Sequence, residues 1–450
     1  MRLNLDLKLT KTLLFGIFLM TVTAFSQTGT GNVSSGLKIS GEVTGILVGQ
    51  RDLSVASVNL LPQLPPGAIL HTQINGNGSF EFSNVLPGKY NIQVVFPRFA
   101  MKDPTTIVVS DHDLTDIKLV LIDTEVITRL ERLEPVWSLN GGWRGLIGGG
   151  GGSVFVSSSS SIAEIDSAGK IVRQLALPPA GILRLAHFTA DGEPALLAFA
   201  AWSPAVRAYS LQGNLLWTYP ENTDGTPPTG IDDVWPVDID GDKSDEVIVG
   251  FNGSTGLHVL NSEGKLIWRT ATIGNVWHVA GGDVLGNSKS QVVTTSATGQ
   301  VHVFSADGKE RQDIYPGFYA NMVRVAQPLN DSIPASILAI GDNTNATTAD
   351  GMIIAALAGD GAKKWSVTLE SGRSSIYSAS VAQTKSWLAA GMRDGRVYVV
   401  DIDRGAIIGQ VDGQGLMPDV TWVINKESGA PLLVVSGQSK LNAYRITGSP

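Results

Sequence analysis

Residues 232–270, DDVWPVDIDGDKSDEVIVGFNGSTGLHVLNSEGKLIWRT, carry the pattern that decides the fold. Three segments rich in Val, Ile and Leu (245–250, 256–260 and 266–269) are separated by turns that contain Gly, which is typical of short β-strands. The last turn places Trp268 four residues after Gly264. The same ending recurs along the chain, so this stretch is one copy of a repeated four-stranded unit.

The spacing of the recurring turn predicts a β-propeller. Its glycines follow one another at intervals of 43 to 53 residues: Gly169, Gly213, Gly264, Gly308, Gly361, Gly405 and Gly448. A period of about 45 residues is that of a four-stranded propeller blade. We therefore expect an all-β fold with seven blades over residues 134–450, with six or eight blades as alternatives.

The two ends of the repeat array predict ring closure. The last copy stops at Pro450 and leaves no room for its fourth strand, whereas residues 134–139, EPVWSL, resemble a fourth strand that no unit precedes. Pairing of the Trp137 segment with residues 441–446 would complete the last blade. Closure would also remove sheet edges that invite aggregation.

The motif Asp/Ser-x-x-Gly-Lys-x-x-Trp resembles the repeats of pyrroloquinoline-quinone-type (PQQ-like) propellers. The middle of the copy at 232–270 resembles an FG-GAP, or integrin-type, propeller repeat. The first resemblance implies that Trp217, Trp268 and Trp365 pack between neighbouring outer strands, so we interpret them as structural. It also raises a quinone-dependent dehydrogenase as an alternative, which the lack of an adjacent Cys pair and the low blade count disfavour.

Residues 36–122 predict a small β-sandwich in front of the propeller. In Phe80-Glu-Phe82 and Tyr90-Asn-Ile92 apolar and polar residues alternate, as on a strand with one buried face. The motifs GNGSFEF at 76–82 and Pro-Gly-x-Tyr at 87–90 resemble a carboxypeptidase regulatory-like (transthyretin-like) domain. That resemblance implies a spacer, a folding aid or an adhesion module.

The first 26 residues have the features of a secretory signal peptide. A basic segment is followed by the apolar run at 13–20 and a small-x-small site, which predicts cleavage between Ser26 and Gln27. A transmembrane anchor is the alternative, but the run is short for a span of about 20 residues. Linkers are expected at 27–35 and 123–133. We expect a bacterial protein that is secreted or periplasmic, without a membrane span in the mature chain.

Charge and cysteine content exclude several functions. Removal of residues 1–26 takes away three basic residues and one acidic residue, which leaves a net charge of about −10. This charge disfavours nucleic-acid partners and anionic membranes, which need a basic face. The chain has no Cys, so disulfides, thiol catalysis and Cys-ligated metals are excluded.

The stretch DIDGDKSDE at 238–246 is the strongest chemical signal. Carboxylates stand at positions 1, 3, 5 and 9, and such hard oxygen ligands suit calcium. By similarity to the calcium loops of FG-GAP repeats, four side chains and one carbonyl would ligate the ion: Asp238, Asp240, Asp242 and Glu246, with the carbonyl of Ser244. The alternative is a solvated acidic turn without an ion. We expect one structural site, since the next copy, DVLGNSKSQ at 283–291, keeps the Asp at position 1 but has Leu285 at position 3 and Gln291 at position 9.

Other candidate residues carry weaker signals. His258 and His302 both lie six residues before their turn Gly, for which packing is favoured over a ring of metal ligands. Trp235 and Trp277 are placed at the beginning of the first strand of adjacent blades, where they could stack on a sugar, although packing is favoured for them too. No catalytic residues can be assembled from the sequence.

The leading hypothesis is an exported, non-catalytic protein that binds a glycan or a protein partner on its propeller. A calcium-dependent polysaccharide lyase or hydrolase is the main enzyme alternative. It would need a basic residue that faces acidic sugar, for which Arg144, Arg207 and Arg324 are candidates.

Overall fold

The computed structural model describes the chain as strands and turns. The described residues are 36–45, 56–63, 69–96, 99–101, 105–123, 132–149, 152–221, 230–329, 333–342, 351–369, 374–412 and 415–447. The predicted signal peptide, the linker at 27–35 and the turn at Gly448 lie outside them. Among the described residues, no helix has the length and hydropathy needed to cross a membrane.

Two four-stranded sheets form a β-sandwich at the N-terminal end, with strand orders β4-β1-β8-β6 and β3-β2-β5-β7. The strands are β1 (Leu37–Gly45), β2 (Ser57–Pro62), β3 (Leu70–Gln73), β4 (Ser79–Val85), β5 (Gly88–Val95), β6 (Phe99–Met101), β7 (Thr105–Val109) and β8 (Leu114–Asp123). Strands β1 and β8 are parallel. One hydrophobic core, which includes Phe80, Phe82, Tyr90 and Ile92, fills the space between the sheets.

The predicted alternation holds for β4 but is wrong for β5. Phe80 and Phe82 are buried and Glu81 is exposed, as expected for a strand with one buried face. On β5, however, Asn91 is also buried, with 1% of its surface exposed. Its side-chain oxygen accepts hydrogen bonds from Gln63 Nε2 at 2.8 Å and from Thr106 Oγ1 at 2.9 Å. Partners on both neighbouring segments therefore make burial of this polar residue possible.

Residues 132–447 form consecutive four-stranded antiparallel sheets of the propeller type. The first sheets contain β10 (Arg144–Gly149), β11 (Ser153–Ser157), β12 (Ile162–Asp166) and β13 (Ile171–Leu175); β14 (Ile182–Ala186), β15 (Ala195–Phe199), β16 (Val206–Tyr209) and β17 (Leu215–Tyr219); β18 (Ile231–Val237), β19 (Glu246–Phe251), β20 (Leu257–Leu260) and β21 (Leu266–Thr270).

The remaining sheets contain β22 (Val276–Gly282), β23 (Gln291–Ser296), β24 (Val301–Phe304) and β25 (Arg311–Ile314); β26 (Tyr319–Ala326), β27 (Ser336–Asp342), β28 (Met352–Leu357) and β29 (Lys363–Leu369); β30 (Ile376–Val381), β31 (Trp387–Met392), β32 (Val397–Asp401) and β33 (Ala406–Val411); β34 (Val420–Ile424), β35 (Pro431–Ser436) and β36 (Lys440–Thr447), with β9 (Arg132–Asn140). Strand β9 pairs antiparallel with β36 and places Trp137 opposite Ala443.

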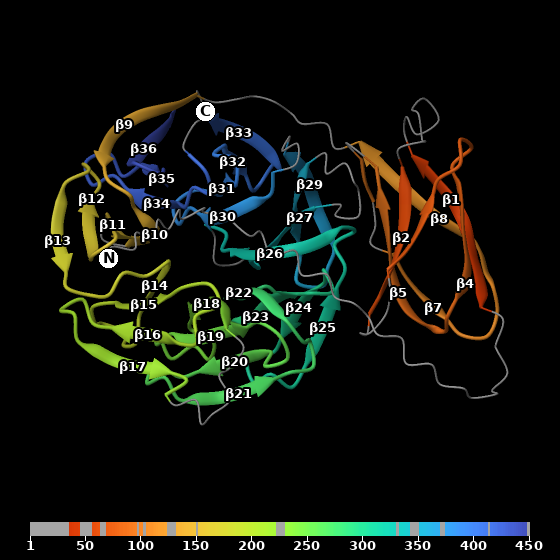
Figure 1. Ribbon diagram of the computed structural model, residues 1–450, viewed down its shortest axis with the longest axis horizontal. Coiled ribbons are helices and arrows are strands. Elements are labelled where there is room, and N and C mark those ends of the chain that lie inside the picture. The colour runs from red at the N-terminus through yellow and green to blue at the C-terminus, as the bar shows by residue number, and fades with distance from the viewer. Residues whose placement is uncertain are drawn as a thin grey trace, which may run out of the picture. The chain divides into compact units, whose positions relative to one another are not determined.

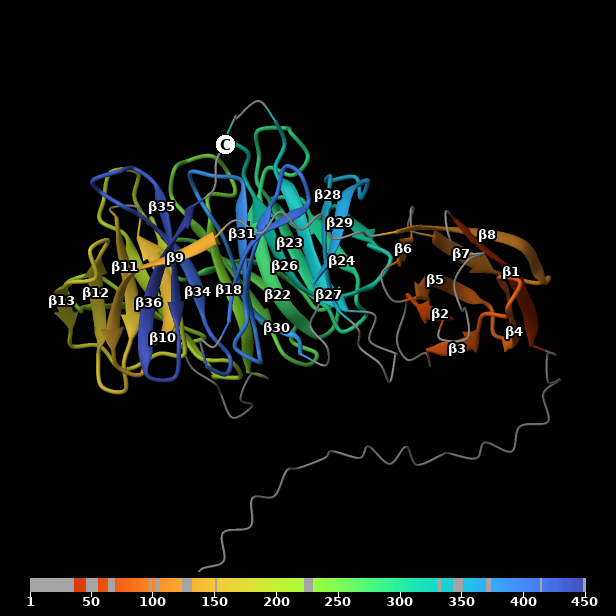
Figure 2. The same ribbon diagram turned by 90° about the horizontal axis from the view of Figure 1, so that it is seen from above.

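The sheets follow one another around a ring, with the first strand of each nearest the centre (Figure 1). Each first strand contacts the first strand of the next sheet, and β34 contacts β10. Seen from the side, the sheets stand upright next to one another (Figure 2). Because neighbours cover both faces of a sheet, middle strands such as β19 are buried at every residue.

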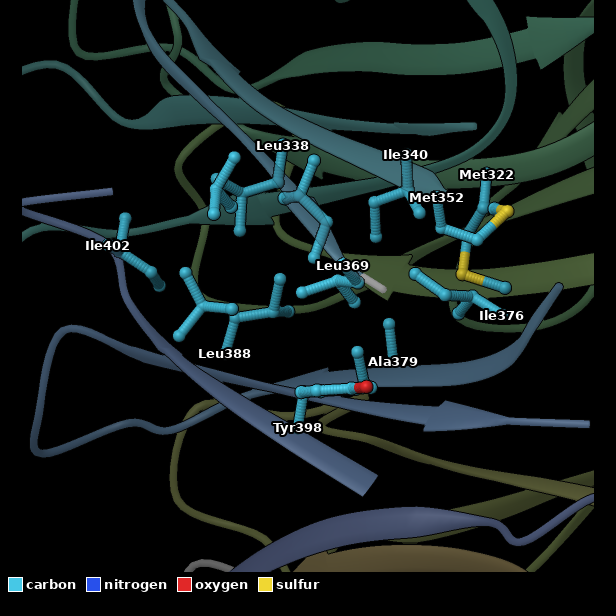
Figure 3. Close-up of a cluster of buried hydrophobic side chains, with 14 of the residues drawn as sticks. Met322, Leu338, Ile340, Met352, Leu369, Ile376, Ala379, Leu388, Tyr398 and Ile402 are labelled. Atoms are coloured by element: carbon cyan, nitrogen blue, oxygen red, sulfur yellow. The ribbon is translucent and has the colours of Figure 1, made fainter. Parts of the chain in front are cut away.

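Hydrophobic contacts between neighbouring sheets form the cores of the ring. Figure 3 shows one such cluster, in which Leu338 and Ile340 of β27 lie with Leu388 of β31 and Tyr398 of β32. Fully burying one Leu or Ile side chain contributes about 1.5–3 kcal/mol to folding. The ring is therefore held together by many contacts that no single sheet can make alone.

Tryptophans of outer strands pack on the turn glycines of the next sheet, which agrees with their interpretation as structural. Trp268 is representative, since its indole Nε1 donates to the Ala306 carbonyl at 2.9 Å and its ring covers Gly308. Gly308 has a φ of 70°, and a Cβ there would lie 2.7 Å from the Trp268 ring. The pairs are Trp137 on Gly169, Trp217 on Gly264, Trp268 on Gly308 and Trp365 on Gly405.

Replacement of one of these tryptophans tests the packing. We expect Trp268→Ala to lower the free energy of unfolding by about 3 kcal/mol, because it removes a large side chain from a packed junction. Gln312→Ala, at the matching but exposed position of the next sheet, should change it by less than about 0.5 kcal/mol. Urea denaturation would measure both. Equal effects would contradict a structural role for the tryptophan.

Candidate functional site

The antiparallel strands give the ring two different faces. The first strand of each sheet begins at what we call the entry face, which also carries the turns between second and third strands, such as residues 252–256. The first strand ends at the exit face, where the loops 238–245 and 283–290 lie. Candidate residues therefore divide between the entry face, the exit face and the interior of the ring.

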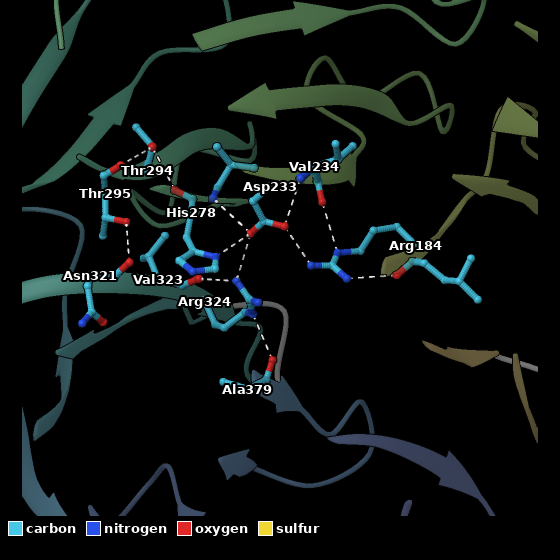
Figure 4. Close-up of polar contacts among 12 residues, drawn as sticks. Arg184, Asp233, Val234, His278, Thr294, Thr295, Asn321, Val323, Arg324 and Ala379 are labelled. Carbon is cyan, nitrogen blue, oxygen red and sulfur yellow. Dashed lines mark hydrogen bonds and ion pairs between the residues drawn. The ribbon is translucent and has the colours of Figure 1, made fainter. Parts of the chain in front are cut away.

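A buried ionic cluster, which we call the Asp233 cluster, joins first strands in the interior of the ring (Figure 4). Asp233 of β18 is 1% exposed. Its carboxylate accepts from Arg184 Nη2 at 2.8 Å and His278 Nδ1 at 2.9 Å, and Arg324 Nη1 lies at 3.5 Å. Arg324 Nε also donates to the Ala379 carbonyl at 3.0 Å. The cluster thereby connects strands β14, β18, β22, β26 and β30.

The charges of this cluster depend on one another. Burial alone would raise the pKa of Asp233, but Arg184, His278 and Arg324 outweigh it and hold that pKa well below its usual range. Burial lowers the pKa of Arg324 to about 10, which Asp233 opposes. Removal of the carboxylate would leave two guanidinium groups with little access to water. The arrangement is suited to fixing the relative positions of the sheets.

The structure places Trp235 and Trp277 at different depths. Trp277 is the second residue of β22 and lies near the entry face, with its ring centroid 5.5 Å from that of Tyr319. Trp235 is the fifth residue of β18, and the guanidinium carbons of Arg184 and Arg324 lie 5.4 and 5.2 Å from its ring centroid. These contacts favour a packing role for Trp235.

The β18–β19 loop at the exit face gathers carboxylates. Oxygens of Asp238, Asp240 and Glu246 lie within 4.8 Å of one another. Asp242 is outside this group, and its Oδ1 accepts from Ser244 N at 2.7 Å. Burial and then the neighbouring aspartates raise the pKa of Glu246 to about 7, against a hydrogen bond from Ile239 N that lowers it.

Two further residues of this loop hold it against the preceding sheet. Asp245 Oδ2 accepts from His187 N at 2.7 Å, and Ser244 Oγ donates to the Phe188 carbonyl at 2.9 Å. His187 and Phe188 follow β14. Asp245, for which the sequence offers no clear role, therefore joins neighbouring loops, and the Ser244 hydroxyl does the same.

The β22–β23 loop has a similar backbone but a different interior. Asp283 accepts from the amides of Asn287 and Ser288, much as Asp238 accepts from Gly241 and Lys243. Gln291, which corresponds to Glu246, donates from Nε2 to Asn287 Oδ1 at 3.1 Å and to the Lys289 carbonyl at 2.6 Å.

The neutral side-chain amide of Gln291 thus provides N–H groups, whose hydrogens carry partial positive charge, inside the β22–β23 loop. An ionised Glu246 has no such hydrogens, because a carboxylate only accepts hydrogen bonds. At the position of Glu246, the β18–β19 loop therefore lacks the partial positive charge that the Gln291 amide provides in the β22–β23 loop.

The two histidines have partners within the array. His258 Nδ1 lies 2.8 Å from Tyr219 Oη, and burial lowers the pKa of His258 to about 4. His302 contacts Asp313 Oδ1 through Nδ1 at 2.7 Å and Ser296 Oγ through Nε2 at 2.9 Å. These contacts agree with the packing interpretation.

The three candidate arginines are not brought together. Arg324 is buried in the Asp233 cluster, Arg207 is exposed on the third strand of its sheet, and Arg144 is exposed at the start of β10. Arg184, Asp233 and His278 were not predicted from the sequence. A usable signal was present, since each is a charged or polar residue among the apolar residues of a first strand.

Comparisons with known proteins agree with a sandwich followed by a propeller. Residues 200–333 match the lambda-carrageenase β-propeller domain, and residues 35–122 match the second β-sandwich domain of the family described as BOS complex subunit NOMO1-like. No curated protein matches the chain significantly. The resemblances to PQQ-like, FG-GAP and carboxypeptidase regulatory-like families stay predictions.

Substitution of Asp233 tests the buried cluster. We expect Asp233→Asn to lower the free energy of unfolding by about 3 kcal/mol or more, because it leaves two buried guanidinium groups uncompensated. Glu134→Gln, which removes one partner of the exposed pair with Arg445, should cost less than about 1 kcal/mol. Chemical denaturation at neutral pH would compare the two variants.

The same variant should alter the acid sensitivity of the fold. Because folding depresses the pKa of Asp233, its contribution is present above its unfolded pKa of about 4 and is lost as pH falls below that value. The difference in stability between the wild type and Asp233→Asn should therefore narrow below about pH 4. A difference that does not change with pH would contradict this role.

Proposed function

We propose that residues 132–447 form a closed, seven-bladed propeller that acts as a binding platform for a polysaccharide. The observation that carries the proposal is the match of residues 200–333 to the lambda-carrageenase propeller domain. The matched segment includes the first strands β18, β22 and β26, whose beginnings line one part of the entry face. Because a fold alone does not give a ligand, a protein partner is the alternative.

Contacts between the first and last sheets support closure of the ring. Gly145 N donates to Asp419 Oδ2 at 2.8 Å, and Gly148 N donates to Thr421 Oγ1 at 2.9 Å. At the outside, Trp137 of β9 covers Gly169 and donates to the Ser167 carbonyl at 2.9 Å. Polar contacts near the centre and aromatic packing at the rim thus join the sheets of β34 and β10.

The platform belongs outside the cytoplasm in this proposal. The features of residues 1–26 favour export. The β-sandwich would then act as a spacer. An enzyme that cleaves the bound polymer, as the name of the matched family indicates for its members, is the second candidate function.

A calcium ion in the β18–β19 loop is part of the proposal. The donor set fits this ion, since Asp238, Asp240 and Glu246 offer carboxylate oxygens within 4.8 Å of one another. The comparison with the β22–β23 loop supports it, because a cation would face the carboxylates at the place where the Gln291 amide provides N–H donors in that loop. With Asp242 and the Ser244 carbonyl completing the shell, the ion would stabilise the loop rather than catalyse.

Exchange of one side chain separates the two loop types. Calcium should raise the unfolding temperature of the wild type, since an ion that binds only the folded state at 100 times its Kd adds about 2.7 kcal/mol. Glu246→Gln should abolish this increase without lowering stability in chelator, because Gln is the residue that the metal-independent loop uses. Thermal unfolding with calcium or EDTA would measure both. No calcium effect on the wild type would contradict the site.

Retention on polysaccharides tests the platform. We expect the protein to be retarded in affinity gels that contain λ-carrageenan or a neutral galactan such as agarose, in calcium and less strongly in EDTA. New reducing ends would identify a hydrolase, and new unsaturated ends a lyase. No retention in either condition would contradict the polysaccharide proposal and favour a protein partner.

A further inference from the structure

Trp202 is the most exposed large hydrophobic side chain in the described part of the chain, at 73%. It lies in the turn between β15 and β16, at the entry face. Its backbone has a φ of 62°, in the left-handed region. A bulky residue rarely adopts this conformation, and such strain persists only where surrounding contacts impose it.

Contacts with the next sheet impose the conformation. Trp202 N donates to the Ile231 carbonyl at 2.7 Å, and Ser203 forms an isolated bridge with Ile231. The backbone of Gly230 approaches so closely that a Cβ there would lie 2.4 Å from Trp202 Cα. The turn is therefore fixed against the start of β18, and the strained residue presents its ring to solvent.

A carboxylate lies beside the indole. The Trp202 side chain is close to Asp232, whose Oδ2 accepts from Asn252 Nδ2 at 3.1 Å. Asp232 is half-buried, and burial raises its pKa. An exposed aromatic ring thus stands beside a carboxylate and an amide that have further hydrogen-bonding capacity.

A second aromatic group lies further along the entry face. The pairing of β18 with β19 shifts register at Asp232, and the pairing of β22 with β23 shifts register at Trp277, so these two residues hold corresponding positions. Trp277 packs against Tyr319, which begins β26. The entry face therefore carries Trp202 with Asp232 between the β14–β17 and β18–β21 sheets, and Trp277 with Tyr319 between the β22–β25 and β26–β29 sheets.

This combination matches the surface chemistry of a sugar. A pyranose ring has an apolar C–H face that can cover an aromatic ring, and hydroxyls at its edge that need donors and acceptors. A hydrophobic protein interface would call for a contiguous apolar patch instead. The polar neighbours Asp232, Asn252 and Ser203 do not provide one.

We propose that Trp202 is the stacking platform of a pyranose-binding site on the entry face, with Asp232 and Asn252 as hydroxyl partners. The site deepens the proposed function, on which it rests. It needs no enclosed cavity, because a polysaccharide chain can lie across the open face towards Trp277. The strain at Trp202 is then the cost of holding the ring outward for a ligand.

The test compares three variants of the whole protein on λ-carrageenan and on agarose. Trp202→Ala should weaken binding at least tenfold to the polymer that retains the wild type. Leu215→Ala, which removes an exposed side chain from outer strand β17, should leave binding unchanged. Trp202→Gly should also lose binding but unfold at the same or a higher temperature, since glycine accepts a left-handed φ. Lost binding could then not be ascribed to unfolding.

The outcomes separate the two proposals. If the wild type is retained and Trp202→Ala is retained equally, the stacking site is wrong while the polysaccharide platform stands. If neither polymer retains the wild type, the platform is wrong and the site falls with it. If the wild type is not retained on either polymer but self-associates, and Trp202→Ala abolishes this self-association, the surface is a protein interface. This outcome would overturn the sugar site.

Discussion

Face-to-face packing of neighbouring sheets is the constraint on which the rest of the array depends. A four-stranded sheet such as β26–β29 has two apolar faces, and neither can be buried without a neighbour. Once sheets pack on both sides, their middle strands become buried throughout, as in β19. Pairing of β9 with β36 meets the same requirement, because β9 supplies the fourth strand of the last sheet, which packs against the first sheet.

Polar and aromatic contacts refine this packing at the inner and outer edges. Near the centre, Asp233 is shared among Arg184, His278 and Arg324 from three other sheets, so their separation is fixed by charge as well as by shape. At the rim, tryptophans cover turn glycines whose φ a side chain would strain. Because these contacts fix the inner and outer edges of the sheets, the turns that connect the strands can vary in sequence. Both candidate binding features, the loop at 238–246 and the turn that contains Trp202, lie in such turns.

The two loops at 238–246 and 283–291 show how one backbone can be stabilised in two ways. In the second, the Gln291 amide donates to the centre of the loop; in the first, the Glu246 carboxylate takes the place of that amide beside Asp238 and Asp240. The change from Gln291 to Glu246, together with the carboxylates of Asp240 and Asp242, thus distinguishes a self-sufficient turn from a candidate cation site. Local chemistry, rather than fold, separates the candidate site from its structural counterpart.

The sequence by itself determined what depends on short-range pattern. The turn glycine with Trp four residues later, the alternation in β4 and the acidic loop are all contained within a few residues, and they predicted strands, repeats and a candidate calcium site. Burial of a polar residue such as Asn91 is different, because it depends on partners that are distant in the sequence. Only the tertiary structure brought together the members of the Asp233 cluster, and only it showed that Trp202 is clamped beside Asp232. These contacts join residues of different sheets, and their positions are decided by register shifts and turns that no local pattern encodes.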